Sequence, residues 1–250
     1  MTRIILTGAC GKMGRVIQDV VNKRDDCEIV AGVDKFNDNC ASFPVYASLN
    51  EVKEDADVVI DFSNPSLLDD LLDFGKKTNT ALVIATTGFD DCQKKKIDDA
   101  SDVCPIFFTY NMSIGINLLA NLAKKAVAIL GNDFDIEIIE QHHNQKIDAP
   151  SGTALMLADA ISEEFDKPMK YEYDRHSKRE KRTKDEIGIH SVRGGTIVGE
   201  HSILFAGRDE NITLSHSARS KEVFAVGAVN AALYMKNKAP GMYDMGELVK

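Results

Sequence analysis

Near its beginning the chain reads Arg3-Ile-Ile-Leu-Thr-Gly-Ala-Cys-Gly-Lys-Met-Gly14. The apolar run predicts a buried strand, and apolar residues from Met13 to Val21 recur at helical spacing after it. Between them lies Gly-x-x-Gly-x-x-Gly, a variation on the dinucleotide-binding loop. Glycines let the backbone turn tightly and approach a pyrophosphate, whose charge is favourable at a helix N-terminus. We therefore expect this loop to bind a nucleotide coenzyme.

An acidic residue at the end of the next predicted strand supports this interpretation. Residues 28–34 read Glu28-Ile-Val-Ala-Gly-Val-Asp34, and Asp34 lies 20 residues after Gly14, where a ribose-binding carboxylate belongs. The alternative is a tight turn with an unrelated acid at a strand end. Lys35 follows, and its ammonium can reach the additional phosphate of NADPH. We expect a modest preference for NADH, with NADPH still used.

Strand and helix patterns continue to alternate up to residue 113. Buried strands are predicted at Asp57–Phe62, Ala81–Ala85 and Pro105–Phe108, and Asn64 with Pro65 begins a helix between the first two. Polar groups at the carboxyl ends of parallel strands line the usual ligand crevice, although ordinary turn chemistry would also explain them. The expected coenzyme-binding residues are Gly8, Ala9, Cys10, Gly11, Lys12, Met13, Gly14, Asp34, Lys35, Phe62, Ser63, Ala85, Thr86, Thr87, Thr109, Tyr110, Asn111 and Met112.

From residue 114 on, the strict alternation of strands and helices gives way to a long helix and then to short strands. A long helix is predicted over residues 114–130. Its expected apolar face consists of Leu118, Leu119, Leu122, Ala126 and Ile129. Beyond residue 186, short strands are predicted at Ile187–Arg193, Thr196–Ala206 and Ile212–Ser217, and these join residues 136–140 in a small mixed sheet.

These patterns predict an α/β chain, with a Rossmann-type parallel sheet domain and an inserted α+β domain built on the small mixed sheet. The expected boundaries are residues 1–113 with 221–250 for the dinucleotide-binding domain, and 114–220 for a substrate-binding and oligomerisation domain. The last helix, residues 221–236, is expected to return to the first domain. We expect the helix over residues 152–165 to cover one face of the small sheet and a partner subunit to cover the other.

The densest group of titratable residues occupies positions 135–154, Asp-Ile-Glu-Ile-Ile-Glu-Gln-His-His-Asn-Gln-Lys-Ile-Asp-Ala-Pro-Ser-Gly-Thr-Ala. A short strand and a helix are predicted at its two ends, and a polar loop between them carries His142, His143, Lys146 and Asp148. These residues can exchange protons near neutral pH and supply a fixed cation. The helix adds free backbone N–H groups that favour a carboxylate or a phosphate. An acidic substrate that needs protonating would fit here.

Two other features have alternative interpretations. The first is a metal site whose ligands would be Glu140, His142, His143 and Asp148. However, adjacent histidines in an extended segment point to opposite sides, and no zinc-binding spacing is present. We therefore predict no metal site. Residues 175–184 carry six cations. They form either a solvated loop or a basic patch that steers an anionic substrate or coenzyme.

Composition excludes several classes of protein. Acidic residues outnumber basic residues by 39 to 30, which argues against nucleic-acid binding. We expect no membrane attachment and a cytoplasmic location, because no signal peptide and no run of 18 apolar residues is present. The five cysteines are odd in number and lack Cys-x-x-Cys spacing, which predicts reduced thiols. Cys10 is expected to fill a tight loop rather than to react.

Residues 137–154 resemble the signature of the dihydrodipicolinate reductase family of bacterial lysine biosynthesis. The resemblance extends through residues 8–14, 85–89, 111–115, 198–201 and 241–245. It implies a Rossmann-type domain formed by both chain ends and an inserted substrate domain whose sheet builds a homotetramer. It also implies that NADH or NADPH reduces a cyclic imine dicarboxylate to tetrahydrodipicolinate, in the diaminopimelate route to lysine.

The same resemblance implies roles for individual residues. By motif position, His142 corresponds to the general acid, and Lys146 to the residue that assists protonation. The residues that would hold the substrate carboxylates are His143, Lys146, Ser151, Gly152 and Thr153. Two alternatives remain: another Rossmann oxidoreductase, or a non-catalytic NAD(P)H sensor, which would have no reason to keep the cluster of His142 and Lys146.

Overall fold

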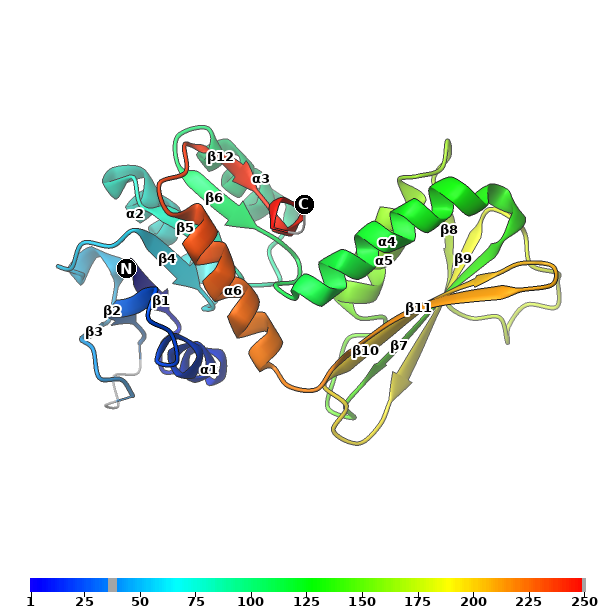
Figure 1. Cartoon of the computed structure of the whole chain (residues 1–250), viewed down its shortest axis with the longest axis horizontal. Helices are drawn as coiled ribbons and strands as arrows, with labels where there is room; N and C mark the ends of the chain where they lie inside the picture. Colours follow the sequence, from blue (N-terminus) through cyan, green and yellow to red (C-terminus); the bar gives the residue numbers. More distant parts are fainter. Residues whose placement is uncertain (36–39, 249–250) are drawn as a thin grey trace. The chain divides into compact units, whose positions relative to one another are not determined.

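The computed structural model describes residues 1–35 and 40–248, which form two compact units (Figure 1). Unit 1 combines Met1–Ile114 with Lys221–Lys250, and unit 2 comprises Gly115–Ser220. Unit 2 is therefore inserted between the two chain segments that build unit 1.

Unit 1 contains a seven-stranded sheet with the strand order β12-β6-β5-β4-β1-β2-β3. Every neighbouring pair in this sheet is parallel. The strands are β1 (Thr2–Thr7), β2 (Cys27–Val33), β3 (Val45–Tyr46), β4 (Val58–Asp61), β5 (Ala81–Ile84), β6 (Pro105–Phe108) and β12 (Gly241–Tyr243). The predicted Rossmann-type parallel sheet is confirmed.

Helices cover both faces of this sheet. They are α1 (Lys12–Val21), α2 (Leu68–Thr78), α3 (Asp91–Ser101) and α6 (Glu222–Met235), with short 3₁₀ turns at Leu49–Glu51, Pro65–Leu67 and Met245–Glu247. Because side chains alternate along a strand, Ile4 joins the core under α1 and α6, whereas Ile5 joins the core under α2 and α3. Asn64 caps the turn that leads into α2, since its side chain accepts a hydrogen bond of 3.0 Å from Ser66 N.

Unit 2 is built on a mixed five-stranded sheet with the order β11-β10-β7-β9-β8. The strands are β7 (Asp135–His142), β8 (Lys170–Glu172), β9 (Glu186–Arg193), β10 (Gly199–Ala206) and β11 (Asn211–Ala218). β7 pairs antiparallel with β10 and parallel with β9. The predicted mixed sheet is confirmed, but the sequence missed β8, and residues 196–198 lie outside the strand that was expected to include them.

Two helices, α4 (Ile114–Leu130) and α5 (Gly152–Ser162), pack on one face of this sheet, and a 3₁₀ turn at Gly131–Asp133 follows α4. The predicted apolar face of α4 was wrong at three of its five residues, because Leu118, Leu122 and Ile129 are 48%, 43% and 83% exposed, whereas Leu119 is buried and Ala126 packs against the core. The residues that α4 buries are Ile116, Leu119, Ala123 and Val127. Since α4 is apolar on most sides, its periodicity does not decide which side the sheet covers.

The apolar character of α4 has a second consequence. By length and composition, residues 114–133 could also cross a membrane, with a mean hydropathy of 1.4. However, Ile116 and Leu119 pack in the core cluster with residues of β7 and α5, such as Ile138 and Leu157. One side of α4 therefore packs in the core of unit 2, while 22% of the apolar window as a whole is buried.

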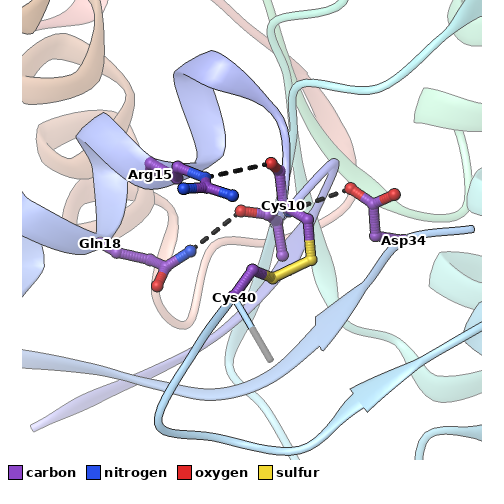
Figure 2. Close-up of a disulfide and its surroundings, with 6 residues drawn as sticks. Cys10, Arg15, Gln18, Asp34 and Cys40 are labelled. Carbon is purple, nitrogen blue, oxygen red and sulfur yellow. Dashed lines mark hydrogen bonds between the residues drawn. A yellow bond between two sulfur atoms is a disulfide. The ribbon is translucent and has the colours of Figure 1, made fainter. Parts of the chain in front are cut away.

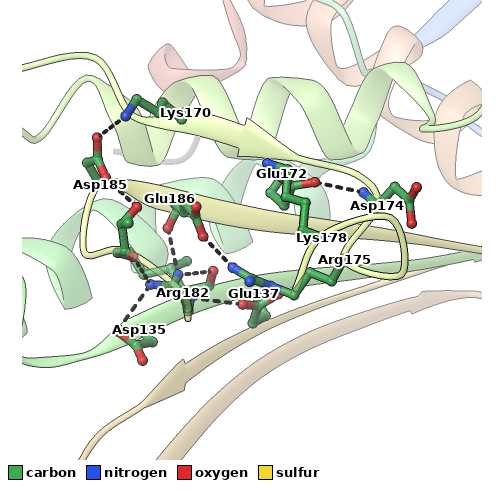
Figure 3. A network of polar contacts seen from close by, with 12 residues as sticks. Asp135, Glu137, Lys170, Glu172, Asp174, Arg175, Lys178, Arg182, Asp185 and Glu186 are labelled. Carbon is green, nitrogen blue, oxygen red and sulfur yellow. Dashed lines mark hydrogen bonds and ion pairs between the residues drawn. The ribbon is translucent and has the colours of Figure 1, made fainter. Parts of the chain in front are cut away.

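The cations of residues 175–184 are anchored to the sheet of unit 2 (Figure 3). Arg175 pairs with Glu186, and Lys178 pairs with Glu172. Arg182 lies 3.1 Å from both Asp135 Oδ1 and Glu137 Oε1, and donates further hydrogen bonds to the carbonyls of Ile136 and Glu186. The segment is a largely exposed loop, as the first interpretation predicts, but these three cations pair with acidic residues and hold it against β7, β8 and β9.

Candidate active site

The glycine loop of unit 1 requires glycine at two of its positions. Gly8 has φ +70°, and a Cβ atom there would lie 2.2 Å from the carbonyl oxygen of Phe62. A Cβ atom at Gly14 would lie 2.2 Å from the carbonyl oxygen of Gly8. Loop, strand and helix therefore pack backbone against backbone, as the sequence predicts for a dinucleotide-binding turn.

A cavity of about 410 Å³ lies beside this loop. It is lined by Gly8, Gly11, Val33, Asp34, Lys35, Ala47, Phe62, Ser63, Asn64, Ser66 and Leu67. Oδ2 of Asp34 accepts a hydrogen bond of 2.9 Å from the backbone N–H of Cys10, which ties the end of β2 to the loop. One cavity is therefore shared by six of the predicted coenzyme-binding residues: Gly8, Gly11, Asp34, Lys35, Phe62 and Ser63.

Cys10 and Cys40 form a disulfide, with Cα atoms 5.4 Å apart (Figure 2). The prediction of five reduced thiols was therefore wrong; Cys27, Cys92 and Cys104 are free. An odd number of cysteines does not exclude one pair. Moreover, only the fold brings together two residues that are 30 positions apart in the sequence.

The ends of β5 and β6 form a second, smaller cavity of about 140 Å³ in unit 1. Its lining includes Thr86, Thr87, Thr109 and Tyr110, all of which were predicted to contact the coenzyme. Two other predicted residues are placed differently. Ala85 and Met112 are 7% and 3% exposed and belong to the core packed against α6.

Further predicted residues do not line either of these two cavities. Ala9 and Gly14 are buried, Cys10 and Met13 are half-buried, and Lys12 is exposed at the start of α1. Asn111 is buried, and its side chain accepts a hydrogen bond of 2.8 Å from Ser113 N. The sequence missed Asp61, a buried carboxylate at the end of β4 that accepts hydrogen bonds from the hydroxyl groups of Thr7 and Ser63.

In unit 2, β7 carries Glu140 and His142 on its helix-covered face. The strand continues to His142, two residues beyond its predicted end, so His142 lies in the strand rather than in the polar loop. Glu140 is fully buried and His142 is 8% exposed. The Nδ1 atom of His142 lies 2.6 Å from Oε2 of Glu140.

Burial and the charge of the partner have opposite effects on the pKa values of His142 and Glu140. Burial lowers the pKa of His142, and the charges of Lys146 and Arg193 lower it further, whereas Glu140 raises it. For Glu140, burial favours a higher pKa, but hydrogen bonds from Arg193 and His142 outweigh this effect and lower the pKa to about 2. Glu140 is therefore an ionised carboxylate.

The loop after β7 holds the remaining predicted cation. Nζ of Lys146 lies 2.9 Å from Oδ1 of Asp148, and Lys146 N donates a backbone hydrogen bond of 3.1 Å to His143 O. His143 follows His142 in the chain, at the point where the strand has ended, and it is half-buried.

Ser151 begins α5 as its N-cap. Its hydroxyl accepts a hydrogen bond of 3.2 Å from Ala154 N and lies 3.1 Å from Nε2 of His201. Ser151 is only 2% exposed, and its N–H donates to Glu140, so it stabilises the start of the helix. Gly152 is exposed and Thr153 half-buried, as groups that meet a ligand at a helix N-terminus must be.

Arg193 and His201 belong to this cluster and were missed by the sequence analysis. Arg193 forms two hydrogen bonds with Glu140, of 2.8 and 2.7 Å, and the ring of His201 lies 5.2 Å from that of His142. Arg193 ends the predicted strand 187–193, whereas His201 lies inside the predicted strand 196–206 and in the segment 198–201 that carries the family resemblance. The sequence places them 53 and 59 residues after the residues that they contact.

A dinucleotide loop with an acid at the end of β2, together with a histidine and a lysine beside a helix N-terminus, defines an oxidoreductase that uses a nicotinamide coenzyme. Family models described as "Dihydrodipicolinate reductase, N-terminus" and "Dihydrodipicolinate reductase, C-terminus" match residues 2–112 and 115–249. The chain belongs to the dihydrodipicolinate reductase family. The resemblance drawn from the sequence is confirmed.

Relatives match over the full length of the chain. A 4-hydroxy-tetrahydrodipicolinate reductase of Caldanaerobacter subterraneus is 51% identical over 250 residues, covering 100% of this chain and 99% of the relative. That of Clostridium novyi is 48% identical with the same coverage. A solved structure of dipicolinate-bound dihydrodipicolinate reductase from Paenisporosarcina sp. TG-14 is 28% identical, has a TM-score of 0.80, and is matched over 100% of both chains.

Proposed function

We propose that the chain acts as a 4-hydroxy-tetrahydrodipicolinate reductase in which His142 donates the proton and Lys146 assists it. The overall activity follows from family membership and from the names of the full-length relatives. The reaction reduces a conjugated cyclic imine dicarboxylate in the diaminopimelate route to lysine, and we infer a cytoplasmic location for it. The observation that carries the catalytic assignment is the contact between Nδ1 of His142 and the buried carboxylate of Glu140.

Unit 1 is the coenzyme-binding part of this proposal. NADH or NADPH supplies the hydride when bound. The residues of unit 1 fit such a coenzyme, because the tight backbone packing at Gly8 and Gly14 forms a dinucleotide-type turn and a cavity lies beside it. Asp34 and Lys35 line the cavity beside that loop, where they would meet the adenosine ribose.

The substrate needs donors for two carboxylates. Unit 2 offers the ammonium of Lys146, the imidazole of His143 and the backbone N–H groups of Gly152 and Thr153 at the start of the 11-residue helix α5. A helix N-terminus favours an anion through its free N–H groups and its dipole. Ser151 contributes by capping this helix, so we assign it a supporting role rather than direct contact.

The proton would leave from Nε2 of His142, because Nδ1 is held by Glu140. Burial and the neighbouring cations lower the pKa of this imidazole, which makes the imidazolium a stronger acid. A substrate dianion beside His142 would favour the protonated imidazolium until its proton is transferred to the substrate.

The assay that tests this function measures oxidation of NADH and of NADPH by the purified protein. The substrate is generated freshly by condensing pyruvate with aspartate semialdehyde. We expect substrate-dependent oxidation of both coenzymes. Coenzyme binding without any turnover would instead identify a sensor, and turnover of an unrelated substrate alone would identify another Rossmann oxidoreductase.

We also propose that the chain forms a homotetramer through the uncovered face of the sheet in unit 2. Ile139 and Leu204 lie on that face, because their neighbours Ile138 and Ile203 point into the core. Apolar side chains on an open sheet face favour a partner. Sedimentation should show a tetramer at micromolar concentration and a smaller species for Ile139→Asp, whereas Ile129→Asp on α4 should keep the tetramer. A wild-type monomer would refute the proposal.

A further inference from the structure

Glu140 is a fully buried carboxylate that accepts hydrogen bonds from three sides. Nη1 and Nη2 of Arg193 lie 2.8 Å from Oε2 and 2.7 Å from Oε1. Ser151 N donates to Oε1 over 3.1 Å, and His142 Nδ1 lies 2.6 Å from Oε2. Each oxygen therefore has two partners, and the carboxylate cannot rotate without breaking several of these hydrogen bonds.

Arg193 is itself held in place. It ends β9, where it lies opposite His142 in the parallel register, and its two terminal nitrogens also donate to the carbonyls of Val192 and Asp148, at 2.8 and 2.7 Å. The bidentate contact fixes the plane of the Glu140 carboxylate. Thus Arg193 of β9 and the N-terminus of α5 contact Glu140 directly, and the loop after β7 holds Arg193 through the carbonyl of Asp148.

This arrangement decides which nitrogen of His142 carries the proton. A carboxylate oxygen at 2.6 Å needs a donor, so Nδ1 must be the protonated nitrogen of the neutral ring. Nε2 then becomes the nitrogen that exchanges its proton. Beside it lies Gly199 of β10, where a Cβ atom would be only 3.1 Å from Nε2. The glycine therefore leaves room at the exchanging nitrogen.

The charged and titratable groups around His142 come from every element packed on it. They are Glu140 of β7, Arg193 of β9, His201 of β10 and Lys146 of the following loop. Burial lowers the pKa of His201 to about 4, so this ring is neutral near neutral pH. Of these four groups, Glu140 is the one that favours the imidazolium, and Arg193 offsets part of its charge.

We propose that Glu140, clamped by Arg193 and by the backbone of Ser151, is a positioning residue that holds His142 with its proton on Nδ1 and its Nε2 free to donate. This proposal deepens the proposed function and rests on His142 as the proton donor. A role in stability alone explains it less well, because buried ion pairs contribute little net stability compared with apolar packing. A role in stability alone also gives no reason for the carboxylate of Glu140 to contact the imidazole of His142.

The test compares Glu140→Gln, Arg193→Gln and the conservative Arg193→Lys in the full-length protein. A general acid must be protonated, so kcat/KM falls as pH rises through the pKa of free His142. Glu140→Gln removes the group that raises this pKa, so the falling limb should move to lower pH. Arg193→Gln removes a cation and leaves Glu140 less neutralised, so the limb should move to higher pH. Arg193→Lys should restore most of the wild-type profile.

The expected loss of kcat for Glu140→Gln is about 10- to 100-fold, less than the roughly 10²–10⁴-fold loss of a general acid itself. A matched control is Glu163→Gln, which removes a solvent-exposed ion pair with Lys124 of the same unit and should leave the profile unchanged. The ring ¹⁵N shifts of His142 provide a readout that needs no turnover. They should report a protonated Nδ1 in the wild type and a loss of this preference in Glu140→Gln.

Two results would overturn the proposal: an unchanged tautomer in folded Glu140→Gln, or limbs that move in the same direction in Glu140→Gln and Arg193→Gln. If His142→Gln retains wild-type turnover, the proton-donor assignment itself fails. If His142→Gln is inactive while Glu140→Gln keeps both the wild-type limb and the wild-type tautomer, only the positioning role fails. Should Arg193→Gln not fold, the tautomer and profile of Glu140→Gln still decide the question.

Discussion

Nζ of Lys146 lies 2.9 Å from Oδ1 of Asp148, within the loop that connects β7 to α5. Asp148 is largely exposed, with 59% of its side chain accessible, whereas 22% of the lysine side chain is accessible. Exposed ion pairs contribute only about 0–1 kcal/mol. Asp148 can therefore orient Lys146 without preventing its ammonium from turning to a substrate carboxylate.

The first prediction concerns this lysine. Lys146→Ala should lower kcat by about 10²–10⁴. It should also raise the KM for the dicarboxylate, because a charge-assisted hydrogen bond worth about 1.5–3 kcal/mol is lost. Steady-state kinetics with Asp148→Asn as the matched variant should show a much smaller change in KM. Wild-type kinetics for Lys146→Ala would remove this residue from the mechanism.

The second prediction concerns the proposed acid. His142→Gln should lower kcat by about 10²–10⁴, while the affinity for NADH, measured by fluorescence titration, should hardly change. The proposed coenzyme-binding residues lie in the other unit, which is why we expect the two effects to be separate. The exposed His176 provides a control, and His176→Gln should behave as wild type. Near wild-type turnover by His142→Gln would assign the proton to another group.

The third prediction concerns coenzyme choice. Asp34→Ala should shift the ratio of kcat/KM values toward NADPH, because the carboxylate would repel the additional phosphate. Lys35→Ala should shift the ratio toward NADH, since its ammonium would attract that phosphate. Both shifts should shrink at high salt. An unchanged ratio in Asp34→Ala would mean that another residue contacts the ribose.

The fourth prediction concerns the thiols. Alkylation of the unfolded protein without reductant should modify the three free cysteines, and alkylation after reduction should modify all five. Peptide mapping should identify Cys10 and Cys40 as the pair that becomes reactive. Five modified cysteines before reduction would show that the pair is reduced in the purified protein, as most cytoplasmic thiols are.

The fifth prediction concerns the pH dependence of stability. Burial and then the charge of His142 lower the pKa of His201 from 6.5 to about 4. The unfolded chain therefore binds more protons as the pH falls from 6.5 toward 4, and stability decreases over this range. His201 should contribute a loss of about 2 kcal/mol in the free energy of unfolding between about pH 7 and about pH 5.

Urea unfolding of His201→Gln measures this contribution. The variant should lose less stability than the wild type over the same pH range, while His176→Gln, at an exposed position, should lose as much as the wild type. Equal losses in His201→Gln and wild type would show that folding does not lower the pKa of His201.

Local patterns determined the parts of this protein that depend on neighbours in the sequence. Gly8 and Gly14 mark the dinucleotide turn because only glycine permits its backbone geometry, and Asn64 marks a helix start because its side chain caps the next turn. The closeness of His142 and Lys146 in the sequence was equally visible, since both lie within five positions. Strand and helix periodicity was sufficient for the longer strands of both sheets but not for the short edge strands β3, β8 and β12.

Only the tertiary structure decided the contacts between distant segments. The sequence misassigned the buried face of α4, because an apolar helix offers several faces and only packing on β7 selects one. It also gave no sign that Cys10 meets Cys40 or that Arg193 clamps Glu140 across 53 positions. Such contacts follow from strand order and register, which arise from the packing of the whole unit rather than from the residues on either side of each group.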